Sequence, residues 1–303
     1  MIKLESIHRL KGHRTRVNCV SFGLVSNVAI SGSSDRKAIV WCLEKGSEIC
    51  TYMHGKGEPV TSCSLLSGDK TAITASRFSN ALHFWSSRTG EPLRIFCIQI
   101  MNGISYFYRI STTELEIVDF SKSVIFLTIH LDESDESIHI EQSEIGPTKE
   151  LIIDIEEGTD QIVLNFPRRN KTMIVLSSQN RVTDAVYNCR QKKLITSAVD
   201  GTIKLFSINP DNMKDGDYVS ACEMCFDSHS EGINQVCFNV AGTFALTASD
   251  DNTCFFIDLY PDSRCALLTL CLSLLPHLVA PSYLLAELVQ NRRIMERIKN
   301  MLL

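Results

Sequence analysis

The sequence predicts an all-β protein, a β-propeller of about six four-stranded blades followed by a C-terminal helical tail. Two observations support this fold class. Four stretches open with a β-branched residue and then alternate as half-buried strands do, beginning at Val17, Val60, Val182 and Ile233. The first two starts are 43 residues apart. A period of about 40–45 residues with four short strands per unit is typical of propeller blades.

The later parts of each repeat follow in the same order. A second strand ends in small residues, and a third strand ends on a large apolar residue, which is Trp41, Trp85, Phe206 or Ile257. The recognisable repeats therefore lie near residues 7–43, 55–95, 180–208 and 229–260. The interval between the last two starts is longer because of a polar insertion near residues 211–217.

Residues 102–178 carry no readable repeat, yet they still consist of short β-branched or aromatic segments separated by polar turns. The 78 residues from Ile104 to Val182 leave room for two degenerate blades. We therefore assign six units to residues 1–262 and a tail to residues 263–303. The sixth unit supplies three strands up to Leu259, so we expect Ile2 to Ile7 to add the outer strand and cover its edge.

The first repeat contains Gly12-His13, Ser31, Asp35 and Trp41. With this set the chain resembles the WD40-repeat family, whose blades hold a His, a Ser or Thr, an Asp and a Trp in one hydrogen-bonded tetrad. The resemblance implies a buried imidazole whose tautomer is fixed by the carboxylate. His13 and Asp35 are accordingly interpreted as a structural pair, although they could be presented as an acid–base pair.

The other repeats carry parts of the tetrad. The last repeat has His229, Thr247 and Asp251, with Ile257 in the Trp position. The second has Trp85 with Ser79 near the Asp position, and the repeat with Asp200 has Phe206 and no His in the expected loop. The tetrad is predicted to be complete once and partial elsewhere.

Charge is unevenly distributed along the chain. Residues 1–111 contain 14 Lys and Arg against 7 Asp and Glu, and residues 112–160 contain 2 against 14. This predicts a basic side and an acidic side of the ring, unless the acidic run is simply a solvated loop tip. Such a field orients protein partners. No long Lys/Arg stripe with interleaved aromatic residues occurs, so nucleic acid is not an expected partner.

The cysteines predict a reducing compartment. Several of the twelve fall where a strand needs a small apolar residue, and no N-terminal signal segment is recognised. We therefore expect free thiols and a cytoplasmic or nuclear location.

No catalytic or cofactor motif is found. The chain lacks a Gly-rich phosphate loop, a His-Glu-x-x-His sequence and a Gly-x-Ser-x-Gly elbow. Cys222 and Cys225 with His229 resemble zinc spacing, but residues three apart on a strand point to opposite faces. We expect no enzyme activity, no cofactor and no metal.

The first two repeats also predict a surface for partners. Because His13 and Asp35 must meet, the loop before the first strand and the turn after the second lie on one rim. This rim would present Arg14, Arg16, Arg36, Arg77 and Phe78. Arginine and aromatic residues are favoured in interface hot spots.

The tail allows several interpretations, one of which is simply an atypical terminus of the propeller. Residues 265–286 carry no charge, which permits a membrane anchor, but Pro276 and Pro281 divide the run into two short helices that could dock on the ring or a partner. The spacing of Leu267, Cys271 and Leu275 resembles the elongin-binding box of WD-repeat substrate receptors in cullin ubiquitin ligases. We expect a non-enzymatic scaffold in a multiprotein complex, with such a receptor or a membrane-tethered adaptor as alternatives.

Overall fold

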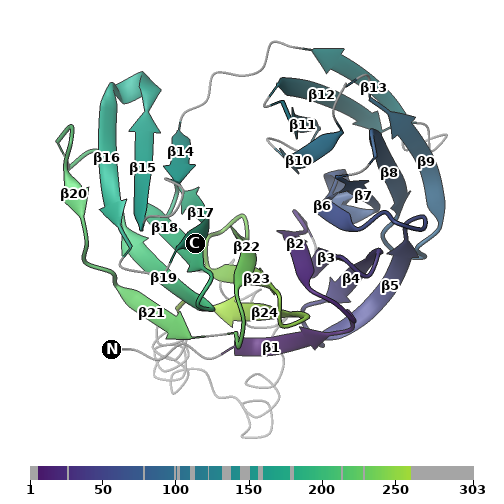
Figure 1. The fold of residues 1–303 in the computed structure, drawn as a ribbon, viewed down its shortest axis with the longest axis horizontal. Coiled ribbons are helices and arrows are strands. Elements are labelled where there is room, and N and C mark those ends of the chain that lie inside the picture. Colours follow the sequence, from purple (N-terminus) through teal and green to yellow (C-terminus); the bar gives the residue numbers. More distant parts are fainter. Residues whose placement is uncertain are drawn as a thin grey trace, which may run out of the picture. The chain divides into compact units, whose positions relative to one another are not determined.

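The computed structural model describes residues 6–260 apart from short gaps at 26, 78, 99, 101–102, 110–112, 122, 132–137, 144–150, 156–159, 178–180, 213 and 228. All its strands belong to one compact unit that ends at Leu259. The strands form six four-stranded sheets, here called blades, arranged around a common centre (Figure 1). The all-β propeller of about six blades is therefore confirmed. The helical tail predicted for residues 263–303 lies outside the described residues.

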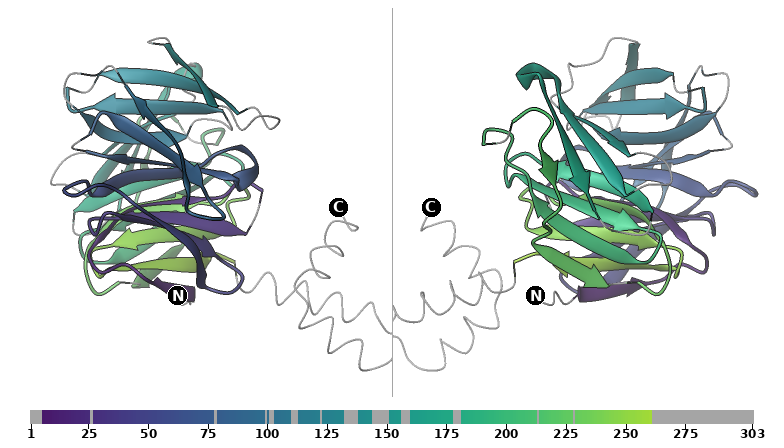
Figure 2. Two further views of the ribbon diagram at one scale, coloured as in Figure 1. Left: turned by 90° about the vertical axis from the view of Figure 1, so that its right-hand side faces the viewer. Right: turned by 60° about the vertical axis from the view of Figure 1, so that its left-hand side comes forward.

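Blades 1 to 3 each consist of four consecutive antiparallel strands. Blade 1 contains β2 (Val17–Phe22), β3 (Val28–Ser33), β4 (Lys37–Cys42) and β5 (Ser47–Met53). Blade 2 contains β6 (Val60–Leu65), β7 (Thr71–Ser76), β8 (Ala81–Ser86) and β9 (Pro92–Cys97), with a 3₁₀ turn at Ser67–Asp69. Blade 3 contains β10 (Ile104–Arg109), β11 (Glu114–Asp119), β12 (Val124–Leu131) and β13 (Ile138–Ser143). The side views show these sheets stacked one after another (Figure 2).

The polar insertion within blade 5 contributes a strand to blade 4. Blade 4 contains β14 (Ile152–Ile155), β15 (Gln161–Phe166) and β16 (Lys171–Leu176), with a 3₁₀ turn at Pro167–Arg169. Blade 5 contains β17 (Val182–Asn188), β18 (Lys193–Ala198), β19 (Thr202–Ser207) and β21 (Met224–Asp227). The short β20 (Tyr218–Val219) leaves blade 5 between β19 and β21 and pairs with β16 in parallel. The insertion thus supplies the outer strand of blade 4.

Blade 6 closes the ring with strands from both ends of the chain. Its β22 (Ile233–Phe238), β23 (Phe244–Ser249) and β24 (Thr253–Asp258) are completed by β1 (Ser6–Lys11), which is antiparallel to β24. Closure by the N-terminal segment occurs as predicted. Of the expected Ile2 to Ile7, residues 6 and 7 belong to this strand, and residues 1–5 lie outside the described part of the chain. The strand reaches Lys11, beyond the expected end at Ile7, because Leu10 pairs with Cys254 and both side chains are buried.

One register irregularity recurs at the start of the inner strands. In five blades the pairing of the first two strands shifts between the first and third residues of the inner strand, at Val17, Val60, Ile104, Val182 and Ile233. Such a bulge bends the strand and redirects a side chain. Ile104 in blade 3 shares it although the surrounding sequence shows no readable repeat.

Polar side chains on the inner strands connect neighbouring blades. The carboxylate of Asp184 accepts a hydrogen bond from the N–H of Val236 (3.0 Å), and the amide oxygen of Gln235 accepts one from Val20 (2.8 Å). The amide of Asn18 donates to the carbonyl of Val60 at 2.7 Å. These bonds join blades 5 to 6, 6 to 1 and 1 to 2, so the rim loops rest on a cross-linked frame.

Candidate functional site

The tetrad of blade 1 is assembled in full. His13 Nε2 lies 2.8 Å from the hydroxyl of Ser31, and the indole N–H of Trp41 donates to the same hydroxyl at 2.8 Å. His13 Nδ1 lies 3.2 Å from Asp35. If the Ser31 hydroxyl donates to Nε2, the ring proton sits on Nδ1 and faces the carboxylate, so every polar atom of the set has a partner.

Asp35 joins two rim segments. Its carboxylate accepts hydrogen bonds from the backbone N–H groups of Arg14 and Lys37, both at 2.9 Å. Burial acts to raise its pKa, but the hydrogen bonds from His13 and from these two backbone groups outweigh it and lower the pKa to about 2. The charged form therefore holds the loop before β2 against the turn after β3.

Blade 6 has an equivalent set without the indole. His229 Nε2 lies 2.6 Å from Thr247 Oγ1, and its Nδ1 lies 2.9 Å from Asp251. Burial lowers the pKa of His229 despite the neighbouring carboxylate, which keeps the imidazole neutral. Both ring nitrogens are engaged, so this histidine does not serve Cys222 and Cys225 as a third metal ligand.

Blade 2 contains a tetrad histidine that sequence analysis missed. His54 Nε2 lies 2.8 Å from Thr74 Oγ1, and the indole of Trp85 donates to the same hydroxyl at 3.2 Å. His54 is six residues before Val60, whereas His13 is four before Val17. Allowing for a loop two residues longer would have identified it. The hydroxyl of Ser79 accepts from the N–H of Ala81 at 3.1 Å and so caps its own turn.

The predicted arginine residues lie at one end of the strands. Because consecutive antiparallel strands alternate in direction, the loop before each inner strand and the turn after each second strand share a rim. Arg14 and Arg16 are exposed in the first of these segments, and Arg36 is half-buried in the second with a φ of 72°. Arg77 follows β7 and is exposed. Phe78 lies outside the described residues.

An aromatic residue from blade 3 joins this group. The guanidinium of Arg77 lies 5.5 Å from the ring centre of Phe120, which follows β11 and is 47 % exposed. A cation over an aromatic face is held by the ring quadrupole. The sequence offered no signal for Phe120 because its blade has no readable repeat. We call Arg14, Arg16, Arg36, Arg77 and Phe120 the arginine rim.

The chemistry of this rim suits recognition. The imidazoles and carboxylates of blades 1 and 6 are buried and committed to hydrogen bonds that hold loops together. The exposed groups are guanidinium ions and an aromatic ring, residue types that in general suit contacts with carboxylates and apolar side chains.

Two other predicted features fall outside this description. The tail box of Leu267, Cys271 and Leu275 and the acidic run at residues 132–136 lie beyond the described residues. In the part of the chain that is described, no helix is long and apolar enough to cross a membrane.

Comparison with known proteins gives a family match to two parts of the chain and similarity to two proteins described below. The WD domain, G-beta repeat, matches residues 4–42 and 220–258, which cover the first three strands of blades 1 and 6 and the outer strand that precedes each of them in the sequence. Nuclear distribution protein nudF of Emericella nidulans is 24 % identical over 302 aligned positions, covering 86 % of this chain and 63 % of nudF. Protein tipD of Dictyostelium discoideum is 31 % identical over 91 residues, 30 % of this chain and 14 % of tipD. The chain spans less than two thirds of either relative.

Proposed function

We propose that this chain, a WD40-repeat β-propeller protein, is a recognition platform that binds protein partners within a multiprotein complex. WD40 propellers are protein–protein interaction scaffolds, generally without catalysis of their own. The observation that supports a specific surface is the arginine rim, where guanidinium groups from blades 1 and 2 and the Phe120 ring of blade 3 share one end of the strands. The partner segment we expect is acidic with an apolar anchor.

The frame beneath the rim favours this role. A binding surface gains affinity when its groups are held in place before the partner arrives. The Asp35 carboxylate fixes the backbone at Arg14, and the side chain of Arg16 bonds to Ser34 Oγ at 3.1 Å. Arg77 is oriented by Phe120. The exposed cations are therefore partly ordered in the free protein.

A paired charge reversal tests the proposal. Arg16→Glu combined with Arg77→Glu should release the main partner from affinity-purified complexes, since an acidic segment would then be repelled. Arg88→Glu is the matched control, because Arg88 is exposed in the β8–β9 turn at the opposite end of the strands. Quantitative mass spectrometry of both samples gives the answer. Recovery of the same partners by the double variant and the wild type would move the binding surface elsewhere.

Localisation remains a prediction. The described cysteines are all free thiols, which supports a cytoplasmic or nuclear environment. Fluorescence imaging of the tagged full chain tests it, and an extracellular or organelle-lumen signal would contradict it.

A further inference from the structure

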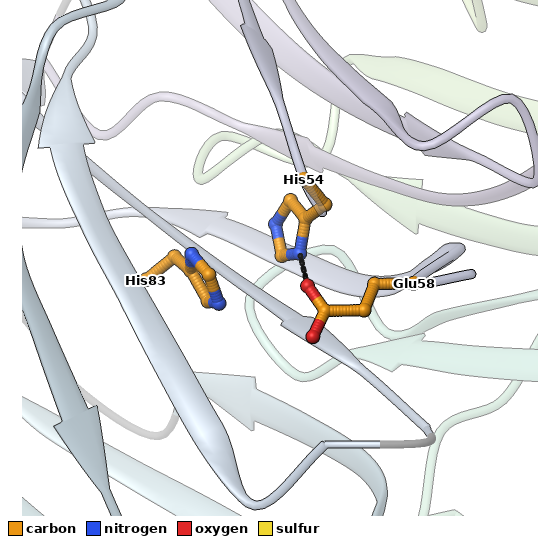
Figure 3. Close-up of side chains that lie close together, drawn as sticks. All are labelled: His54, Glu58 and His83. Carbon is orange, nitrogen blue, oxygen red and sulfur yellow. Dashed lines mark ion pairs between the residues drawn. The ribbon is translucent and has the colours of Figure 1, made fainter. Parts of the chain in front are cut away.

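Two histidines and a glutamate converge beside the seam of blades 1 and 2. His54 follows β5, Glu58 lies four residues later in the same loop, and His83 lies on β8. One ligand atom from each residue lies within 4.8 Å of the other two (Figure 3). Among the described residues this is the one group with such an arrangement. We propose that His54, Glu58 and His83 bind a divalent transition-metal ion, with Zn²⁺ as the best match.

The strongest indication is an unpaired buried nitrogen. The His54 side chain is fully buried, and its Nδ1 atom has no hydrogen-bond partner. Buried polar atoms nearly always have a partner. This nitrogen points at the carboxylate of Glu58, whose Oε2 is 3.9 Å away, too far for a hydrogen bond (Figure 3). A metal ion between the two would give His54 Nδ1 the partner that it lacks.

The residue types at this site suit a divalent transition metal. Neutral imidazole and ionised carboxylate are the forms that coordinate Zn²⁺, and two histidines with one glutamate form a known zinc ligand set.

Neighbouring groups orient the two rings. The hydroxyl of Tyr52 lies 3.0 Å from His83 Nδ1, which leaves Nε2 of that ring for the ion. With an ion on His54 Nδ1, the His54 proton moves to Nε2 and is donated to Thr74. The Thr74 hydroxyl has two lone pairs, so it can accept from both His54 and Trp85. Such outer partners fix metal-binding imidazoles in many sites.

The geometry requires a small contraction. In a tetrahedral site with bonds of about 2.0–2.1 Å, ligand atoms are about 3.3 Å apart. Here His54 Nδ1 and Glu58 Oε2 are 3.9 Å apart, and all three ligand atoms lie within 4.8 Å of one another. Glu58 can supply most of the movement, because it lies in a loop and its side chain is 32 % exposed. The N–H of Gly55 donates to Glu58 Oε2 at 3.1 Å and holds the carboxylate nearby. Three protein ligands leave a fourth position for water.

The proposal departs from the expectation of no metal. Sequence spacing gave no warning, because the third ligand lies on a strand 25 residues beyond Glu58. The site would tie the loop before β6 to the third strand of blade 2. That loop belongs to the same rim as Arg14 and Arg16, so an ion would order a further part of the binding surface.

Cobalt titration of the metal-free full chain provides the test. We expect one equivalent of Co²⁺ to give the visible d–d bands of a four-coordinate site, and Zn²⁺ to displace it. Glu58→Gln should weaken Co²⁺ binding at least about tenfold, as loss of supporting partners alone often does, and His83→Gln should weaken it further. Glu48→Gln is the matched control, since Glu48 is an exposed carboxylate on the adjacent β5.

Three results would overturn the proposal. The first is the absence of four-coordinate bands in the wild type. The second is unchanged affinity in Glu58→Gln, which should stay folded because its side chain is partly exposed. The third is a thiolate-to-cobalt charge-transfer band, which would place the ion on cysteines.

Discussion

Replacing Asp35 by alanine should lower the free energy of unfolding by about 2 kcal/mol at pH 7. The change removes the acceptor of three N–H groups, on His13, Arg14 and Lys37. His13 is buried and cannot turn to water, and a buried donor left unsatisfied costs about 1–3 kcal/mol. The two backbone groups lie nearer the surface and recover part of their hydrogen bonding from solvent.

The pKa of Asp35 gives an independent magnitude for this loss in the free energy of unfolding. Its fall from 3.8 to about 2 corresponds to about 2 kcal/mol in favour of the charged form, reduced to about 1–2 kcal/mol by solvent screening at the rim. Because the folded-state pKa is lowered, this contribution is fully present above about pH 4 and is lost as the pH falls from 4 towards 2. The difference between wild type and variant should therefore shrink at pH 3.

Urea unfolding followed by tryptophan fluorescence measures both effects, because the Trp41 indole bonds to Ser31 within the same tetrad. Asp227→Ala is the control, since Asp227 is an exposed aspartate at the end of an outer strand. A loss below about 0.5 kcal/mol, the usual range for a surface substitution, would refute the tetrad argument. An equal loss at pH 7 and pH 3 would refute the role given to the charge.

Two further predictions concern the ring and the tail. Burial raises the pKa of Asp184 to about 6 despite its hydrogen bonds from Val236 and Ala185. The folded state therefore favours the protonated carboxyl. This contribution to the free energy of unfolding is complete below about pH 4 and is lost as the pH rises through 6. Hydrogen exchange in β17 and β22, corrected for intrinsic rates, should then be faster at pH 8 than at pH 5, and Asp184→Asn should reduce this difference. A chain ending at Asp262 should keep its β-sheet circular dichroism, because β1 already completes blade 6. It should also lose at least one co-purifying protein. Loss of the sheet signal, or retention of every partner, would contradict this prediction.

The sequence was informative where the repeat is local. The alternation in the inner strands and the spacing of Ser31, Asp35 and Trp41 depend on a few neighbouring residues, so the blades containing them could be predicted with their sets of contacts. The number of six blades followed from the length of chain between the recognisable repeats, which leaves room for two further blades. The extension of the closing strand to Lys11 could not be predicted, because its register depends on pairing with β24, more than 240 residues away.

Features that depend on distant partners could not be predicted. The two-residue β20 pairs in parallel with a strand of the previous blade, and the insertion that carries it looks only like a polar loop. Phe120 contacts Arg77 across a blade boundary. His54 and Glu58 were missed for a different reason, since the longer loop shifted the histidine just outside the expected start of the second repeat.

The distribution of tetrads follows from how the ring is closed. Joining β1 to β24 brings together the two ends of the propeller chain, and the entropic cost of closing such a long loop must be offset by contacts there. The histidine sets with an aspartate partner lie in blade 6 and blade 1, which meet at this closure. Arg9 of β1 also forms an ion pair with Asp251 at 3.2 Å and lies over the Phe255 ring. Blade 2 is connected through the chain to blade 1 on one side and to blade 3 on the other, so it takes no part in this closure. Its histidine has no aspartate partner, and His54 Nδ1 is therefore free for another ligand.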